Sequence, residues 1–276
     1  MRCQIMHGGR RHETRIGWLI GLFCLVAFSS AVRADESAWS SIHRDLFSNR
    51  AISQDDGVLF LEAPEKADDA AVVPIRVRIP PEYQGSLRTL TLVIDNNPSP
   101  VAATFHFGPA AGFSGERMIA TRVRMNAQSA VRAILETEDG TLHMAKRLVN
   151  AAGGCSAASP KDQDGVTEMG DVRIKILPPA AGSTWLTEGQ VMLRHPNYTG
   201  MQMNPTTGTF LPARFVNELT VTSGGETVFK MEGGIAISAN PHLRFTLQYA
   251  TGQVITATAV DTDGASFVGV YPAEGF

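Results

Sequence analysis

The chain has 276 residues, 18% of them charged, and a formal net charge of −3 at pH 7. Removal of the leader described below takes away five arginines and one glutamate, which lowers the net charge to −7. A chain this acidic, with no basic patch in its sequence, is not suited to bind nucleic acid or an anionic membrane surface. Residues 35–276 are enough for two domains of ordinary size.

The first 34 residues have the features of a secretory signal peptide. Four arginines precede an apolar run over residues 18–28, which is too short for a transmembrane helix of about 20 residues. Val32 and Ala34 stand at positions −3 and −1 of a cleavage site after Ala34. We therefore expect export to a bacterial periplasm, with no membrane insertion of the mature protein.

Cysteine is the most informative residue type in this chain. Cys3 and Cys24 lie in the expected leader, so the mature protein keeps only Cys155. An unpaired cysteine is unusual in an exported protein, where thiols are normally oxidised to disulfides. Gly153 and Gly154 precede it and carry no side chain that would bury or stiffen the segment, so we expect an exposed, mobile and reactive thiol. The alternatives are an incidental surface thiol and a disulfide-linked homodimer through Cys155.

Period-two alternation of apolar residues dominates both halves of the chain and predicts an all-β protein. The exception is residues 37–47, where Trp39, Ile42 and Leu46 have the spacing of a short amphipathic helix. Strands are expected in the first half at residues 73–79, 90–94, 104–107, 119–125, 131–138 and 141–149, and in the second half at residues 171–177, 190–194, 215–222, 226–231, 243–249 and 254–261.

A segment without periodicity, residues 150–170, separates these two sets of strands and is rich in alanine, glycine, serine and aspartate. Such a composition is typical of a flexible linker. We therefore expect two antiparallel β-sandwich domains, over residues 35–150 and 171–276, joined by a linker over residues 151–170 that carries Cys155.

The chemistry of a lone thiol depends on what surrounds it. A cysteine hydrolase or acyl-transfer enzyme needs a histidine held against the sulfur, and a mobile linker holds such geometry poorly. The candidates are His106, His143, His195 and His242, each of which also suits a strand or loop without catalytic use. A tethered carrier has the opposite requirement, because its thiol must enter the cleft of another enzyme. We therefore expect a non-catalytic carrier without a cofactor, since the sequence has no phosphate loop, dinucleotide fingerprint, zinc spacing or haem-attachment motif.

A second constellation, within residues 195–203, combines His195 with Met201 and Met203. Imidazole and thioether sulfur are ligands that suit Cu(I), and the two methionines share one face of an extended strand. A copper-handling protein is therefore an alternative. Methionines of an irregular loop also pack well against a sandwich core without any metal.

Four segments of the first half resemble SoxY, the sulfur-carrying subunit of periplasmic thiosulfate oxidation: residues 94–102, 105–112, 121–124 and 153–155. The second half resembles SoxZ, the partner subunit, at residues 194–196, 199–200, 237–241 and 261–264. This likeness covers nearly the whole mature chain, in order. It is greatest to the fused SoxYZ-like carriers encoded beside quinoprotein (PQQ-dependent) alcohol dehydrogenases.

The resemblance implies two immunoglobulin-like β-sandwiches and a cysteine that bears the intermediates of the pathway covalently. Carried over to this chain, Cys155 is the covalent attachment site, Gly153 and Gly154 are the swinging arm, and the second half is a docking scaffold. In the family's scheme a haem-containing partner joins thiosulfate to the thiol, and other enzymes hydrolyse or oxidise the adduct. The implied partners are periplasmic sulfur-oxidation enzymes or c-type cytochromes.

The sequence departs from the SoxY pattern after the cysteine. SoxY ends in Gly-Gly-Cys-Gly-Gly at a free C-terminus, whereas here Cys155 is followed by Ser156, Ala157 and a second domain. An arm tethered at both ends has a shorter reach, so we expect a different set of client enzymes. The alternative from another functional class is an accessory protein of a periplasmic quinoprotein alcohol dehydrogenase, in which the thiol has a secondary role.

Overall fold

The computed structural model describes residues 38–54, 57–158, 169–177 and 186–272. The predicted leader, its cleavage site after Ala34 and residues 159–168 of the predicted linker lie outside these ranges. Within them, no helix is both long enough and apolar enough to cross a membrane.

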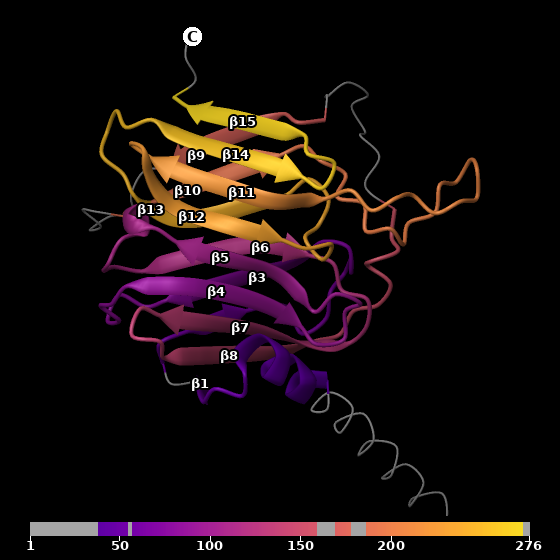
Figure 1. The fold of residues 1–276 in the computed structure, drawn as a ribbon, viewed down its shortest axis with the longest axis horizontal. Coiled ribbons are helices and arrows are strands. Elements are labelled where there is room, and N and C mark those ends of the chain that lie inside the picture. The colour runs from indigo at the N-terminus through magenta and orange to yellow at the C-terminus, as the bar shows by residue number, and fades with distance from the viewer. Residues whose placement is uncertain (1–37, 55–56, 159–168, 178–185, 273–276) are drawn as a thin grey trace, which may run out of the picture.

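The N-terminal helix spans residues 38–47, as the sequence predicts. Its apolar face buries Trp39 and Phe47 in a small cluster with Val93 of the underlying sheet. The ring of Trp39 also lies 4.1 Å from the guanidinium of Arg132, which is a cation–π contact. The helix therefore covers one end of the first half of the molecule (Figure 1).

The strands of the first half follow the alternation that predicts them. In β3 (Val73–Ile79) the valines and isoleucines are buried, while Pro74, Arg76 and Arg78 face outward. The other elements of this half are β1 (Ile52–Gln54), β2 (Phe60–Glu62), β4 (Leu87–Ile94), β5 (Val101–Phe107), the short 3-10 helix η1 (Pro109–Ala111), β6 (Arg117–Val123), β7 (Ser129–Thr137) and β8 (Leu142–Val149).

The strands of the second half show the same pattern. In β14 (Ile255–Asp261), Ile255, Ala257 and Ala259 are buried, and the threonines between them are partly exposed. The other strands are β9 (Val172–Leu177), β10 (Leu186–Leu193), β11 (Val216–Ser223), β12 (Glu226–Gly233), β13 (His242–Gln248) and β15 (Ser266–Tyr271).

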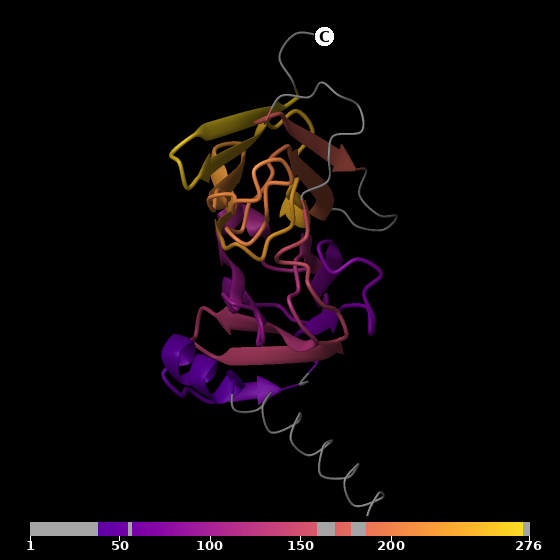
Figure 2. The same cartoon turned by 90° about the vertical axis from the view of Figure 1, so that its right-hand side faces the viewer.

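These strands form two sheets, and both sheets run through both halves of the chain. The nine-stranded sheet has the order β1-β8-β7-β4-β5-β12-β11-β14-β15, and the six-stranded sheet has the order β2-β3-β6-β13-β10-β9. Each half is thus a sandwich, and the halves join edge to edge where β5 pairs with β12 and β6 pairs with β13. Figure 2 shows the two halves stacked one above the other, with the second half uppermost. We call the two junctions, β5–β12 and β6–β13, the seam.

The seam contains a continuous hydrophobic core. Phe229 of β12 packs edge to face on Phe105 of β5 and on Phe245 of β13, with ring centroids 5.6 and 5.1 Å apart. All three rings are fully buried. Edge-to-face aromatic pairs contribute about 0.5–1.5 kcal/mol beyond their buried area. The two halves therefore stabilise each other directly and are not connected by the linker alone.

The predicted fold class of two antiparallel β-sandwiches is confirmed, and every predicted strand is present within a few residues of its expected bounds. The sequence did not predict β1, β2 or β15, and the first two have only three residues each. Three residues are too few to show alternation. Among the described strands, β1 departs from the antiparallel prediction because it pairs in parallel with β8.

Candidate functional site

Cys155 lies in a turn that follows β8 and folds back onto the chain just after β6. We call residues 153–157 the thiol turn. The N–H of Gly153 donates to the carbonyl of Asn126 at 2.9 Å, and the N–H of Gly154 donates to the carbonyl of Met125 at 2.8 Å. Cys155 is only 1% exposed. The expectation of an exposed thiol is therefore wrong, because backbone hydrogen bonds dock the turn on the first half, whereas the mobility of the segment stays a prediction.

The docked conformation favours glycine at both positions, and most strongly at Gly154. Gly153 has a φ of +78°, and a left-handed conformation costs a residue with a Cβ about 1–2 kcal/mol. A Cβ on Gly154 would overlap the carbonyl oxygen of Ala70 and lie 2.8 Å from that of Met125. Only glycine allows two backbone segments to approach so closely. The two glycines therefore allow the thiol turn to pack closely on the neighbouring backbone. They can also make the turn more flexible when it leaves this position.

Arg124 sets the electrostatic environment of the thiol. It is fully buried, and its Nη1 donates to the carbonyl of Gly154 at 3.1 Å and to that of Ala157 at 3.4 Å. Burial raises the pKa of the Cys155 thiol, and the positive charge of Arg124 opposes this rise only in part. The docked cysteine is therefore a neutral thiol at pH 7, and a neutral thiol is a poor nucleophile.

The second half of the chain completes the surroundings of the thiol turn. Thr199 is buried, and its Oγ1 donates to the carbonyl oxygen of Cys155 at 2.7 Å. The Thr199 N–H donates to Gln202 Oε1 at 2.8 Å, which fixes this loop. We call Ala70, Arg124, Met125 and Thr199 the seat of the thiol turn. Because the seat draws on both halves, the thiol is held at their junction.

The loop after β4 holds the seat in position. Asn97 Nδ2 donates to the carbonyl of Arg124 at 2.8 Å, and Asn97 Oδ1 accepts the N–H of Asn126 at 2.9 Å. In the same loop, Asp95 forms a buried ion pair with Arg132, whose Nη2 lies 2.7 Å from Asp95 Oδ2. Arg132 Nε also donates to Asp95 Oδ1 at 3.0 Å. A bidentate pair of this kind fixes the relative orientation of the two side chains as well as balancing their charges. The loop therefore supports the chain segment on which the thiol turn docks.

Sequence reasoning identified Cys155 and its glycines but missed Arg124, Thr199 and Asn97. These three residues belong to the segments 121–124, 199–200 and 94–102, on which the family resemblance rests. The segments are far apart in the sequence, and the fold brings them together around Cys155. The presence of these three residues in segments that match the family was the signal from which they could have been identified as neighbours of Cys155.

The residues of the copper alternative do not form an open set of ligands. His195 is buried, with Nδ1 2.7 Å from Asn197 Oδ1 and Nε2 3.3 Å from Asp261 Oδ2, so both nitrogens already have partners. Met203 is 56% exposed, whereas Met201 is half-buried. In the described part of the chain, no group of three or more histidine, cysteine, aspartate or glutamate side chains is placed to hold a metal ion. His195 thus helps to hold the loop that carries Thr199, and the copper alternative stays a prediction.

Each half of the chain matches a known protein family. Residues 43–155 match the family of the sulfur oxidation protein SoxY, and residues 174–271 match that of the sulphur oxidation protein SoxZ. The chain is a fused SoxY–SoxZ protein. The SoxY match ends on Cys155, and Thr199 of the seat belongs to the SoxZ match. These families indicate a sulfur-oxidation carrier protein, and members of both are non-catalytic.

Solved structures that are similar to parts of the chain include three of low sequence identity. The sulfur carrier protein SoxY from Chlorobium limicola f thiosulfatophilum is 22% identical, covers 42% of this chain and 94% of its own, and has a TM-score of 0.35. A superoxide reductase (neelaredoxin) from Ignicoccus hospitalis is 18% identical, with 36% and 93% covered and a TM-score of 0.29. Red sea bream transglutaminase is 11% identical, with 77% and 30% covered and a TM-score of 0.25. No curated protein matches the sequence.

Proposed function

We propose that this protein is a periplasmic carrier whose Cys155 covalently holds a sulfur group derived from thiosulfate while partner enzymes act on it. The SoxY and SoxZ families support a carrier in sulfur oxidation. The observation that carries the proposal to one residue is the end of the SoxY match at Cys155, the only cysteine after the expected leader. The leader-like N-terminal sequence supports the periplasmic location.

In the proposed cycle, the sulfur of Cys155 and the outer sulfur of thiosulfate join through a new S–S bond. The step releases the thiol proton and two electrons, which pass one at a time to the haem iron of a c-type cytochrome partner. A hydrolytic partner then adds water to the terminal sulfonate sulfur. This second step releases sulfate and one proton and leaves a persulfide on Cys155. The carrier contributes a sulfur atom and a tether, so it needs no catalytic residue of its own.

The docked thiol turn adds a conformational step to this cycle. A partner has to reach a sulfur that is 1% exposed and neutral in its seat. Each hydrogen bond that holds the turn, such as those from Gly153, Gly154 and Thr199, contributes about 0.5–1.5 kcal/mol net. The favourable free energy of partner binding is large enough to offset their loss. The arm therefore has a docked, protected position and an undocked, reactive one.

Reconstituted thiosulfate oxidation tests the proposal. The purified protein is mixed with thiosulfate and with its cytochrome and hydrolase partners, and haem reduction is followed by absorbance. Cys155→Ser should reduce the rate to background and remove the mass of the adduct, while circular dichroism shows an intact fold. Ser156→Ala, in the same turn, is the matched control and should keep the rate. Turnover at the normal rate by Cys155→Ser would contradict the carrier proposal.

Export is tested separately by N-terminal sequencing of the protein released from the periplasm. We expect the mature chain to begin at Asp35. A chain that keeps the first 34 residues and stays in the cytoplasmic fraction would contradict the periplasmic location.

A further inference from the structure

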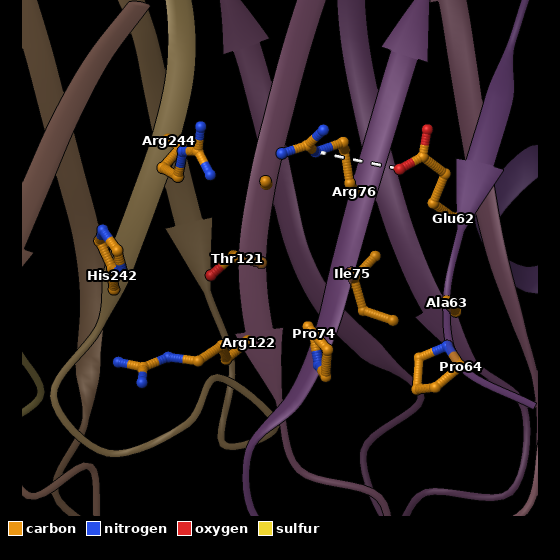
Figure 3. Close-up of a pocket in the computed structure, with 11 residues that line it drawn as sticks. Glu62, Ala63, Pro64, Pro74, Ile75, Arg76, Thr121, Arg122, His242 and Arg244 are labelled. Carbon is orange, nitrogen blue, oxygen red and sulfur yellow. Dashed lines mark ion pairs between the residues drawn. The ribbon is translucent and has the colours of Figure 1, made fainter. Parts of the chain in front are cut away.

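The seam also forms a pocket of about 490 Å³ on the outer face of the six-stranded sheet (Figure 3). Ala120 of β6 is paired with Arg76 of β3 on one side and with Arg244 of β13 on the other. Directly opposed side chains have Cβ atoms about 4.5–5.5 Å apart. Two guanidinium-bearing side chains thus flank an alanine, and the small size of Ala120 leaves the hollow between them.

More cationic side chains continue this surface. Arg122 lies two residues along β6 from Ala120 and so faces the same side of the sheet, and it lines the pocket together with His242. A second hollow of about 360 Å³ shares Arg122 and His242 and adds Arg173, Arg194 and the carboxylate of Asp171, which pairs with Arg173 at 2.8 Å. Burial lowers the pKa of His242, so the arginines supply the positive charge, and Arg122 contributes to both hollows.

The carboxylates around the pocket offset only part of this charge. Glu62 lies 4.0 Å from Arg76, a contact that Figure 3 marks, and Glu188 accepts hydrogen bonds from Arg244 at 2.5 and 2.9 Å. Among the described residues, Arg122 makes no ion pair with a carboxylate. Its positive charge is therefore left for a ligand of the pocket.

Two buried polar atoms beside the pocket also lack a hydrogen-bond partner among the described residues. Arg122 Nη2 donates to the carbonyl of Asn240 at 3.0 Å. However, Arg122 Nε and His242 Nε2 are buried and make no hydrogen bond within the described ranges. Burial lowers the pKa of Arg122, as expected for a charge that is poorly solvated. Both atoms are closed to solvent, so a ligand of the pocket would be held by the outer N–H groups of Arg122 and of the neighbouring arginines.

We propose that the pocket at the seam binds a polyatomic oxyanion of the sulfate and thiosulfate class. Arg76 and Arg244 flank the hollow over Ala120, and Arg122 lines the same pocket two residues farther along β6. Such a group of arginines suits an anion with several acceptor oxygens, because arginine binds such groups through several donors. Cys155 does not line the pocket, so this inference does not depend on the carrier chemistry.

Isothermal titration calorimetry tests the proposal with sodium sulfate and with sodium thiosulfate, at an ionic strength held constant with sodium chloride. Arg122→Gln should weaken binding of both anions by about tenfold or more, because it removes a charged hydrogen-bond donor from the site. Arg147→Gln is the matched control. Arg147 is exposed on β8 of the other sheet, so its replacement should leave the affinity unchanged.

Ala120→Ile gives a second test that keeps every charge of the pocket. Its side chain would fill the hollow from the outer face of β6, so the core stays intact and anion binding should be lost. Absence of sulfate and thiosulfate binding to the wild type would overturn the proposal, as would equal affinity in the wild type and Ala120→Ile. The proposal would also be overturned if polyglutamate bound and sulfate did not displace it. That result would assign the surface to acidic polypeptides.

Discussion

Alanine at each glycine of the thiol turn tests whether docking controls access to Cys155. At Gly154 a Cβ would overlap the carbonyl oxygen of Ala70, so the turn has to leave its position. Overpacking costs about 1–3 kcal/mol, and loss of the hydrogen bond from the Gly154 N–H to Met125 adds about 1 kcal/mol. Alanine also restricts the undocked chain, which offsets about 0.4–1 kcal/mol, so at 1.4 kcal/mol per factor of ten the undocked fraction should rise roughly 5- to 370-fold.

Gly153→Ala is the matched control for this experiment. Its Cβ would meet no atom within 4 Å, so only the left-handed φ of +78° is unfavourable, by about 1–2 kcal/mol. Alanine also restricts the undocked chain, which offsets about 0.4–1 kcal/mol. The undocked fraction of Gly153→Ala should therefore rise by about fifteenfold at most.

The rate of Cys155 labelling by a thiol reagent, relative to the rate in denaturant, measures the undocked fraction. Gly154→Ala should react much faster than Gly153→Ala, and Gly153→Ala no more than about fifteenfold faster than the wild type. Circular dichroism melting curves show whether either variant unfolds globally. Equal labelling rates in the two variants would refute the reasoning, and so would a wild type that labels as fast as the denatured chain.

Three further predictions concern the seat and its support. Thr199→Val removes the hydroxyl that donates to the carbonyl of Cys155. The loss of about 1 kcal/mol should raise the labelling rate about fivefold. Thr258→Val, on the solvent face of β14, is the control and should leave the labelling rate unchanged. Because burial raises the pKa of the Cys155 thiol, alkylation should reach its half-maximal rate above the ordinary thiol pKa of about 8.5. The docked state should lose stability as the pH rises through that value, since the undocked form releases the proton first; an ordinary midpoint in the wild type would contradict a buried thiol. Arg132→Met removes the ion-pair partner of buried Asp95 and should lower the free energy of unfolding in urea by about 3–5 kcal/mol. A decrease of less than about 1 kcal/mol, the range of exposed ion pairs, would show that the pair is not needed.

The strands could be predicted from the sequence because each sheet buries one face, and period-two alternation reports this directly. β3 and β14 are clear examples, with buried and exposed residues in strict alternation. The seam could not be predicted in the same way. Alternation shows which face of β5 or β6 is buried, but it does not show which strand lies at the next position in the sheet. The shared core of Phe105, Phe229 and Phe245 therefore emerges only from the structure.

The position of Cys155 was identified from the sequence, but its environment was not. Two adjacent glycines are compatible with either a mobile arm or a close backbone contact. The choice depends on the carbonyl of Ala70, which lies far from Gly154 in the sequence. Arg124 was equally hidden, because an arginine beside a strand is expected at the surface, whereas here it is fully buried. Association with a quinoprotein dehydrogenase and a homodimer through Cys155 stay predictions.

The most direct test of the central claim is the intact mass of the mature protein, isolated without reductant from its native periplasm while thiosulfate is being oxidised. We predict an added mass equal to sulfur atoms or to a thiosulfate-derived group, located on Cys155 and removed by reductant. An unmodified Cys155 thiol under the same conditions would contradict the carrier function.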